Sequence, residues 1–389
     1  MMTGDDCSYT AMTRTILSTE TFSSDLIRAN FPGDSALAAG SLHQSGAGKS
    51  TLPNSLNKQP IDCVDRALTL PIECPPTLVV VIDTEEEFNW AQEFDTRSRS
   101  TTNIQFQPLA QSVFDRHGVI PTYVIDYPVA DTASAVSVLR TIAESGRCQI
   151  GAHLHPWVNP PYEETVNSLN SYPGNLPPRL ETEKLRLLTE RIDEAFESRP
   201  TIYKAGRYGI GNSTFDALAG LGFETDVSVV PHTDFSDQLG PDFTRFPTGP
   251  FRTSQGIAAL PLSVHFVGIL ASVGPGLFPC LSTPLAKQAR LPGIAARLGL
   301  LERLRLSPEG HTLADMKRQT MAAIDRGERY FMLTYHSSAL LPGATEYVRS
   351  DADRIAFLRR LEGYLIFFKN ICGGRTTTIG ELTQSLESI

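Results

Sequence analysis

The strongest constraint on the fold is a regular alternation of short apolar runs with amphipathic stretches beyond residue 77. Between the runs lie helical patterns such as 182–197, where Leu185, Leu188, Ile192 and Phe196 fall on one helical face. Such alternation predicts a parallel sheet covered by helices, as a closed or nearly closed barrel or as an open doubly wound sheet. The seven apolar runs occupy residues 78–83, 121–126, 148–154, 201–206, 223–229, 258–266 and 330–335.

Several helix boundaries carry their own local signals. Gly118 and Gly146 each follow an amphipathic stretch, where a left-handed residue ends a helix most easily. Thr312 and Asp315 have the spacing of a capping box and predict that a helix begins there.

Residues 1–75 differ from the rest of the chain in composition and in hydrophobic periodicity. Ser, Thr, Asn, Gly and Pro dominate and hydrophobic periodicity is weak, which predicts a poorly ordered extension before a domain at 76–389. Within it, the segment SGAGKST imitates a phosphate-binding loop. However, His43 stands where that motif needs glycine and no strand precedes it, so no nucleotide site is expected.

Charge and cysteine content exclude several classes of protein. The formal net charge of -9 argues against a nucleic-acid binder and against a polybasic membrane anchor. The six cysteines are scattered and form no C-x-x-C pair, so neither a disulfide framework nor a cysteine zinc site is indicated. The N-terminus MMTGDDCSYT has no apolar core, which favours a cytoplasmic location.

One apolar stretch, residues 257–281, resembles a membrane span in composition. Pro261, Pro275 and Pro279 interrupt it, whereas a spanning helix needs about 20 largely uninterrupted apolar residues. The stretch therefore predicts a buried strand followed by an apolar loop, and no membrane span is expected.

Polar residues that are costly to bury follow the predicted strands at their carboxyl ends. In a barrel these ends meet on one rim, where catalytic residues gather. Glu86 and Glu87, which extend the first of these clusters, are expected only to begin a solvated helix. The remaining polar residues on this rim are Asp83, Glu85, His153, His155, Arg207, Tyr208, Asp226 and His336.

Two histidines and a carboxylate form a common open site for a divalent catalytic ion. His153 and His155 are two apart on an extended segment, so both side chains can point to one side. A bound ion lowers the pKa of its water, while another carboxylate can serve as base and an opposing histidine as acid. The set predicts metal-assisted hydrolysis.

Residues 78–382 resemble the polysaccharide deacetylases of carbohydrate esterase family 4, and most of all their WalW-type branch, which is associated with lipopolysaccharide biosynthesis. The resemblance rests on five segments: VIDTEEEFNW, IGAHLHPW, KAGRYG, ETDVS and LTYH. It implies a distorted (β/α)7 barrel that binds a divalent ion, zinc or alternatively cobalt or nickel, and acts on an N-acetylated saccharide.

The resemblance also implies roles for individual residues. Asp83 would be the general base, with Arg207 paired to it and Asp226 behind the arginine. The metal ligands would be Glu85, His153 and His155.

On the substrate side, His336 would be the acid for the leaving amine and the backbone N–H of Tyr208 would help hold the oxyanion. Leu333 would form a wall of the acetyl pocket, and Trp157 would either stack on a sugar or serve as packing.

Three departures separate this chain from the usual motifs. Thr84 lies between the two acids of the first motif, Trp157 occupies the position of the second histidine, and Gly209 replaces a proline. The expected function is removal of N-acetyl groups from a sugar of a polysaccharide or lipopolysaccharide precursor. Its alternatives are a glycan-binding barrel without metal and a glycoside hydrolase, which would need two opposed carboxyl groups and no metal. The oligomeric state is left open.

Overall fold

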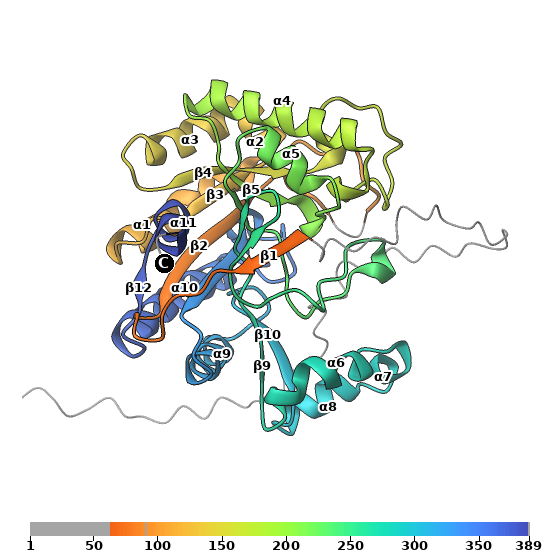
Figure 1. Cartoon of the computed structure of the whole chain (residues 1–389). Coiled ribbons are helices and arrows are strands. Elements are labelled where there is room, and N and C mark those ends of the chain that lie inside the picture. The colour runs from red at the N-terminus through yellow and green to blue at the C-terminus, as the bar shows by residue number, and fades with distance from the viewer. Residues whose placement is uncertain (1–62, 90–91, 388–389) are drawn as a thin grey trace, which may run out of the picture.

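The computed structural model describes residues 63–89 and 92–387 as a single α/β unit (Figure 1). Its strands are β1 (Val64–Ala67), β2 (Thr77–Thr84), β3 (Thr122–Ile125), β4 (Gln149–Leu154), β5 (Ile202–Ala205), β6 (Thr225–Asp226), β7 (Phe251–Thr253), β8 (Ala258–Ala259), β9 (Val264–Val267), β10 (Glu302–Arg305), β11 (Tyr330–His336) and β12 (Arg375–Thr376).

The α-helices are α1 (Gln107–Arg116), α2 (Tyr127–Asp131), α3 (Ala133–Ala143), α4 (Pro178–Phe196), α5 (Thr214–Gly220), α6 (Gly274–Leu281), α7 (Pro284–Gln288), α8 (Leu291–Arg297), α9 (Leu313–Asp325), α10 (Asp351–Asn370) and α11 (Ile379–Glu387). Short 3-10 turns are η3 (Thr102–Phe106), η4 (Pro156–Val158), η5 (Pro173–Asn175), η6 (Gly206–Tyr208), η7 (Ser236–Gln238), η8 (Ala271–Val273) and η9 (Ser337–Leu340).

The centre of the molecule is a parallel sheet in the order β8-β6-β5-β4-β3-β2-β11, with one strand from each of the seven predicted runs. The sixth run, 258–266, was expected to be one strand but divides into β8, which joins this sheet, and β9, which does not. The segment that follows β8 contacts β11 at the other end of this order: the Met332 N–H donates to Ser263 Oγ at 2.8 Å, and the Tyr330 hydroxyl donates to the Pro261 carbonyl at 2.9 Å. The sheet therefore curls into a nearly closed barrel, and the predicted α/β barrel class is confirmed.

The strands are buried on both faces, as a parallel sheet requires. Every residue of β2 is buried, and its run of valines and isoleucine supplies the β-branched side chains that suit such a strand. On the outer face of β11, Phe331 packs against Phe368 and Tyr335 against Phe357, both from α10. The helices thus form the outer layer of the barrel.

The local helix signals act as predicted. Thr312 Oγ1 accepts from the Asp315 N–H, and the Asp315 carboxylate accepts from the Thr312 N–H, which completes the capping box of α9. Gly118 and Gly146 have φ of +58° and +69°, a backbone conformation that glycine adopts without strain.

The fold begins earlier than the expected boundary near residue 75. β1 pairs with β7 in antiparallel fashion, and Leu68 is buried in the core. The sheet thus includes residues from Val64 onward. The rest of the expected extension, residues 1–62 with the SGAGKST segment, lies outside the described residues.

The apolar stretch at 257–281 contains β8, β9 and then α6, so the expected apolar loop is wrong. β9 pairs with β10 as a separate antiparallel ribbon, and α6, α7 and α8 lie between these two strands in the chain. Figure 1 shows these three helices projecting from the barrel. Across the described ranges, each helix is too short or too polar to cross a membrane.

Candidate metal and catalytic site

Strand register brings distant polar residues to one rim. β11 lies beside β2 with His336 opposite Asp83, and β5 lies beside β4 with Lys204 opposite His153. Parallel strands end at the same edge of a sheet, so these side chains meet although they come from four separate segments.

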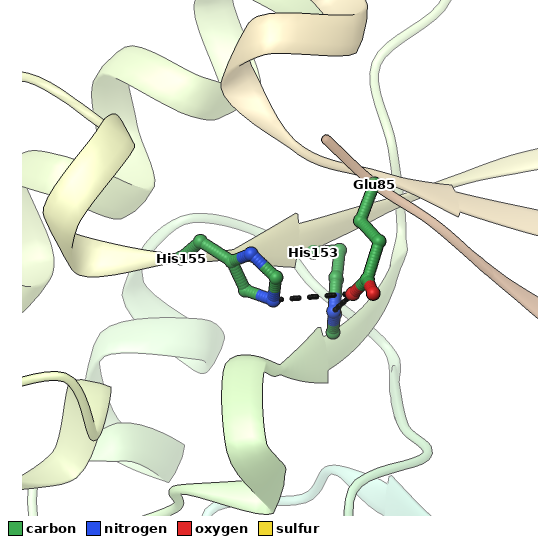
Figure 2. A group of neighbouring side chains, drawn as sticks. All are labelled: Glu85, His153 and His155. Carbon is green, nitrogen blue, oxygen red and sulfur yellow. Dashed lines mark ion pairs between the residues drawn. The ribbon is translucent and has the colours of Figure 1, made fainter. Parts of the chain in front are cut away.

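Glu85, His153 and His155 form a compact group of metal-ligand donors (Figure 2). The Nε2 atoms of the two histidines each lie 3.4 Å from Glu85 Oε2, and all three side chains are buried. Their donor atoms lie within 4.8 Å of one another, close enough to be shared by one ion. The structure thus assembles the three residues expected to bind metal.

The opposite nitrogen of each histidine is already engaged. His153 Nδ1 lies 3.0 Å from the Lys204 carbonyl oxygen, and His155 Nδ1 lies 2.8 Å from Glu86 Oε2. A carbonyl oxygen only accepts, so Nδ1 of His153 carries the proton and Nε2 presents its lone pair toward Glu85. This arrangement is typical of metal-binding histidines, which are oriented by an acceptor behind them.

The electrostatics of this group also fit a cation. Burial lowers the pKa of His153 and lowers that of His155 to about 4, so both imidazoles are neutral, as ligands must be. Burial raises the pKa of Glu85 to about 7 and that of Glu86 to about 8. A divalent ion would favour the charged form of both carboxylates. The donor set therefore fits a divalent metal.

Beside this group, Asp83 forms a buried ion pair with Lys204. Lys204 Nζ donates to both carboxylate oxygens at 2.6 and 2.8 Å, and lies 3.3 Å from Thr334 Oγ1. Burial by itself raises the pKa of Asp83, but Lys204, His336 and His153 outweigh it and lower the pKa to about 2. Asp83 is ionised at neutral pH, as a general base must be.

The expected partner of Asp83 was Arg207, and this assignment is wrong. Arg207 Nη1 donates to Ser171 Oγ at 2.5 Å, its Nη2 donates to Gln238 Oε1 at 3.3 Å, and its guanidinium lies 3.9 Å from the centre of the Tyr172 ring. The cause is local: Arg207 has φ of +54°, and this turn directs it toward the loops above the rim.

Asp226 was expected behind Arg207 and instead supports the end of β5. Its carboxylate accepts from the hydroxyl and the backbone N–H of Ser228, and Ser228 Oγ accepts from the Ala205 N–H. Burial raises the pKa of Asp226 to about 6, while the nearby charge of Lys204 acts to lower it. The cation that interacts electrostatically with Asp226 is therefore Lys204 and not Arg207.

His336 lies between two carboxylates. Its Nε2 is 3.5 Å from Asp83 Oδ2, and its Nδ1 is 2.9 Å from Glu309 Oε2. Burial alone lowers the pKa of His336, but Glu309, Glu85 and Asp83 together raise it well above the usual range. The side chain is 28% exposed against 3% for Asp83, so a protonated imidazole faces the outside of the rim.

Tyr208 follows Arg207 in the same turn and also has a positive φ, +60°. Its hydroxyl accepts from Arg305 Nη1 at 3.0 Å, and its ring centre lies 5.3 Å from Lys204 Nζ. Two consecutive non-glycine residues in this conformation mark a strained turn of the kind found at functional sites. The oxyanion role of the Tyr208 N–H stays a prediction.

A glycine permits this turn to approach the metal group. A Cβ on Gly206 would collide with the Leu154 carbonyl oxygen and with His155 Cδ2. Any larger residue at position 206 would therefore displace His155.

Trp157 is a packing residue and offers no open surface for a sugar. It is 1% exposed, stacks on His155 with ring centres 4.3 Å apart, and packs against Phe88 and Phe94. Its indole N–H donates to Glu86 Oε1 at 2.9 Å. It thereby holds the carboxylate that orients His155.

Leu333 does not line the rim. Side chains alternate along a strand, and Thr334 and His336 point toward Lys204 and Asp83. Leu333 therefore shares the opposite face with Phe331 and Tyr335, which pack on α10, and it is fully buried there. The expected wall of an acetyl pocket is part of the core between sheet and helices.

The sequence interpretation missed Lys204, Glu86 and Glu309. Lys204 had a visible signal, because a lysine inside an apolar strand needs a buried partner. Glu86 was expected at a solvated helix start but is buried, and its N–H donates to Asp126 Oδ2 at 2.6 Å. Glu309 comes from a loop without strand periodicity, so no local pattern marks it.

Comparison with known proteins assigns no family by sequence: no protein-family profile and no curated protein matches the chain. Among solved structures, a candidate polysaccharide deacetylase from Mycobacterium smegmatis aligns with TM-score 0.49 and 14% identity over 84% of this chain and 95% of that one. A family 4 acetyl xylan esterase from Clostridium thermocellum, in complex with a cobalt ion, aligns with TM-score 0.38 and 12% identity over 80% and 92%.

A pseudoenzyme of carbohydrate esterase family 4 from Bacillus anthracis also aligns, with TM-score 0.37 and 10% identity over 79% of this chain and 66% of that one. The similar structures thus include both a metal-bound esterase and a protein described as a pseudoenzyme. TM-scores below 0.5 at such identities establish no activity for this chain.

Proposed function

We propose that this chain is a metal-dependent hydrolase that removes N-acetyl groups from a saccharide. One observation carries the proposal. The donor group Glu85, His153 and His155 adjoins an ionised Asp83 and a protonated His336 on a single rim. A metal-binding group, a base and an acid are the parts that hydrolysis of an amide requires.

Glu85, His153 and His155 would hold the ion, zinc or another first-row divalent metal. When bound, such an ion supplies a Lewis acid and lowers the pKa of the attacking water.

The remaining steps belong to side chains of this chain. Asp83, kept ionised by Lys204, accepts the proton of the attacking water as the new C–O bond forms. His336, kept protonated by Glu309, donates its proton to the amine nitrogen as the C–N bond breaks. The products are acetate and a free amino sugar. Since the base is ionised and the acid is protonated, the pair is ready for this reaction near neutral pH.

The direct test is acetate release from a panel of N-acetylated saccharides, with and without added divalent ions, together with elemental analysis. About one ion per chain is expected on this donor set. His153→Ala should lose the metal and the turnover. His117 is paired with Glu362 outside the rim, so His117→Ala should keep its metal and its turnover.

Replacing the acid separates chemistry from metal binding. His336→Ala should keep its metal and its fold while kcat falls, because the acid acts on the leaving group. If the wild-type chain binds saccharide, binds no metal and releases no acetate, the protein is a glycan-binding barrel. Cleavage of a glycosidic bond without metal would identify a glycoside hydrolase.

A further inference from the structure

The three helices between β9 and β10 form a distinct surface, called here the helical insertion and comprising residues 269–300. Six of the fifteen large apolar side chains that are exposed among the described residues lie within it. These are Ile269, Val273, Leu285, Leu291, Ile294 and Leu298, with exposed fractions of 41–79%. Such a concentration of exposed apolar groups on one short segment is typical of a docking surface.

The apolar residues are arranged in an ordered way. Leu291, Ile294 and Leu298 are spaced by three and four residues, so they lie on one face of α8 and its C-cap, and all three are exposed. Leu285 of the preceding helix α7 is 79% exposed. Figure 1 shows α6, α7 and α8 projecting away from the sheet, where this face can meet a partner.

The charge of the insertion differs from that of the whole chain. The sequence of residues 269–300 contains three basic residues, Lys287, Arg290 and Arg297, and no acidic one, whereas the chain as a whole carries -9. Arg290 and Arg297 are exposed. A surface that combines exposed apolar side chains with only positive charge is complementary to a partner that is both apolar and anionic.

We infer that the helical insertion docks on the surface of an anionic lipid bilayer. A bilayer interface offers both features at once, since negative headgroups lie above an apolar interior. The helices are short and interrupted by Pro279, Pro284 and Pro292, so they lie in the interface and do not cross it. A second copy of the same face is a poorer partner, because two positive surfaces repel each other.

The insertion is fixed to the rim described above. Arg303 of β10 lies over the Phe278 ring of α6, at 5.1 Å from its centre, and donates to the His232 carbonyl oxygen. Arg305 of the same strand donates to the Tyr208 hydroxyl. These contacts connect β10 both to the insertion and to the turn that carries Tyr208, and the docking inference does not depend on any catalytic activity.

Vesicle binding by the purified full chain tests the inference. The probes are phosphatidylcholine vesicles with and without about 30% phosphatidylglycerol, since the anionic lipid supplies the negative surface. The chain should sediment with the anionic vesicles, bind the zwitterionic ones weakly, and dissociate as salt increases. Arg290→Asn should reduce the salt dependence, whereas Arg349→Asn, an exposed arginine outside the insertion, should not.

A matched pair of double variants tests the apolar face. Leu285→Asp with Leu298→Asp should lower the vesicle partition coefficient by at least about tenfold, because both side chains would enter the interface. Ile355→Asp with Ile371→Asp adds the same charge at exposed apolar positions of α10 and its C-cap and should retain much more binding. The two leucine variants are also measured singly, and because both side chains are exposed, thermal unfolding should stay near that of the wild type.

Three outcomes would overturn the inference. The first is a wild-type chain that stays in the supernatant with anionic vesicles at low salt. The second is a control pair that loses as much binding as the leucine pair. Concentration-dependent self-association in the absence of vesicles, abolished by the leucine pair, would instead assign this face to contacts between protein molecules.

Discussion

The rim has two halves, in which the pKa values of the buried carboxyl groups are shifted in opposite directions. In the donor half, Glu85 and Glu86 lie beside neutral histidines and burial raises their pKa values to about 7 and 8. In the ion-paired half, Asp83 lies against Lys204 and its pKa is lowered to about 2. The ion-paired half contains its own cation, whereas the donor half contains three side chains that could bind a metal ion.

Lys204 connects the two halves. Its backbone carbonyl accepts from His153 in the donor half, while its ammonium group binds Asp83 in the ion-paired half. The register of β4 and β5 sets both contacts, since His153 and Lys204 are neighbours across the strands. Substitutions that act on one half or on both can therefore distinguish their roles.

Replacing Lys204 should produce the largest loss of stability. Lys204→Met leaves the buried Asp83 carboxylate without its partner, a change that costs about 3–5 kcal/mol when a buried pair is broken. Urea unfolding measures the loss. The double variant with Asp83→Asn should recover part of it, because the uncompensated charge is then absent.

The pH dependence of this variant has a definite sign. In the wild type the folded pKa of Asp83 lies below its usual value, so the pair stabilises the fold above pH ~4 and the effect is lost as pH falls toward 2. Without Lys204, burial raises the folded pKa, so the variant should become less stable as pH rises from about 4 to 7. Lys184→Met, which removes the other buried lysine and leaves Asp83 paired, should keep the wild-type trend for Asp83. An unchanged pH trend in Lys204→Met would show that Asp83 does not depend on this partner.

Asp83 and Glu85 should have separable roles. Asp83→Asn should retain near-stoichiometric metal while its turnover falls roughly a hundredfold or more, the scale for removing a general base. Glu85→Gln should weaken metal affinity, and excess ion should partly restore activity. Metal titration and acetate-release kinetics decide between them. Loss of metal in Asp83→Asn together with its retention in Glu85→Gln would reverse the assignment.

The carboxylate behind His155 should matter less than a ligand. Glu86→Gln weakens the acceptor that orients His155, and such changes lower metal affinity by about 10–100-fold. Glu87→Gln is the matched control, because Glu87 accepts from Ser100 and from the Asn103 N–H outside the donor group. Equal metal affinity in the two variants would contradict the orienting role of Glu86.

The smallest predicted effect is a shift in the pH profile. Glu309→Gln removes a negative charge that favours the imidazolium of His336, so the pKa of His336 should fall. With a lower pKa, His336 loses its proton at a lower pH, so the alkaline limb of the kcat/KM profile should move to lower pH. Glu302→Gln, which alters an ion pair with Arg318 away from His336, should leave that limb in place. A limb that moves in both variants would exclude a specific role for Glu309.

The sequence by itself determined the class of fold and the rim that carries the polar residues. Apolar runs at strand length, separated by amphipathic segments, can bury both faces only as a parallel sheet with helices outside, and all seven runs contain strands of that sheet. Because parallel strands end at one edge, the sequence alone predicts that Asp83, Glu85, His153, His155 and His336 lie together. Their chemical roles stay predictions.

Only the tertiary structure decided which of these polar groups meet. The segment KAGR contains two cations within four residues, and strand register with a left-handed turn selects Lys204 for Asp83 and directs Arg207 elsewhere. Glu309 reaches His336 from a loop, and the edges of the barrel approach through Ser263 and Met332. Such contacts depend on the positions of segments far apart in the chain, and local periodicity contains no information about those positions.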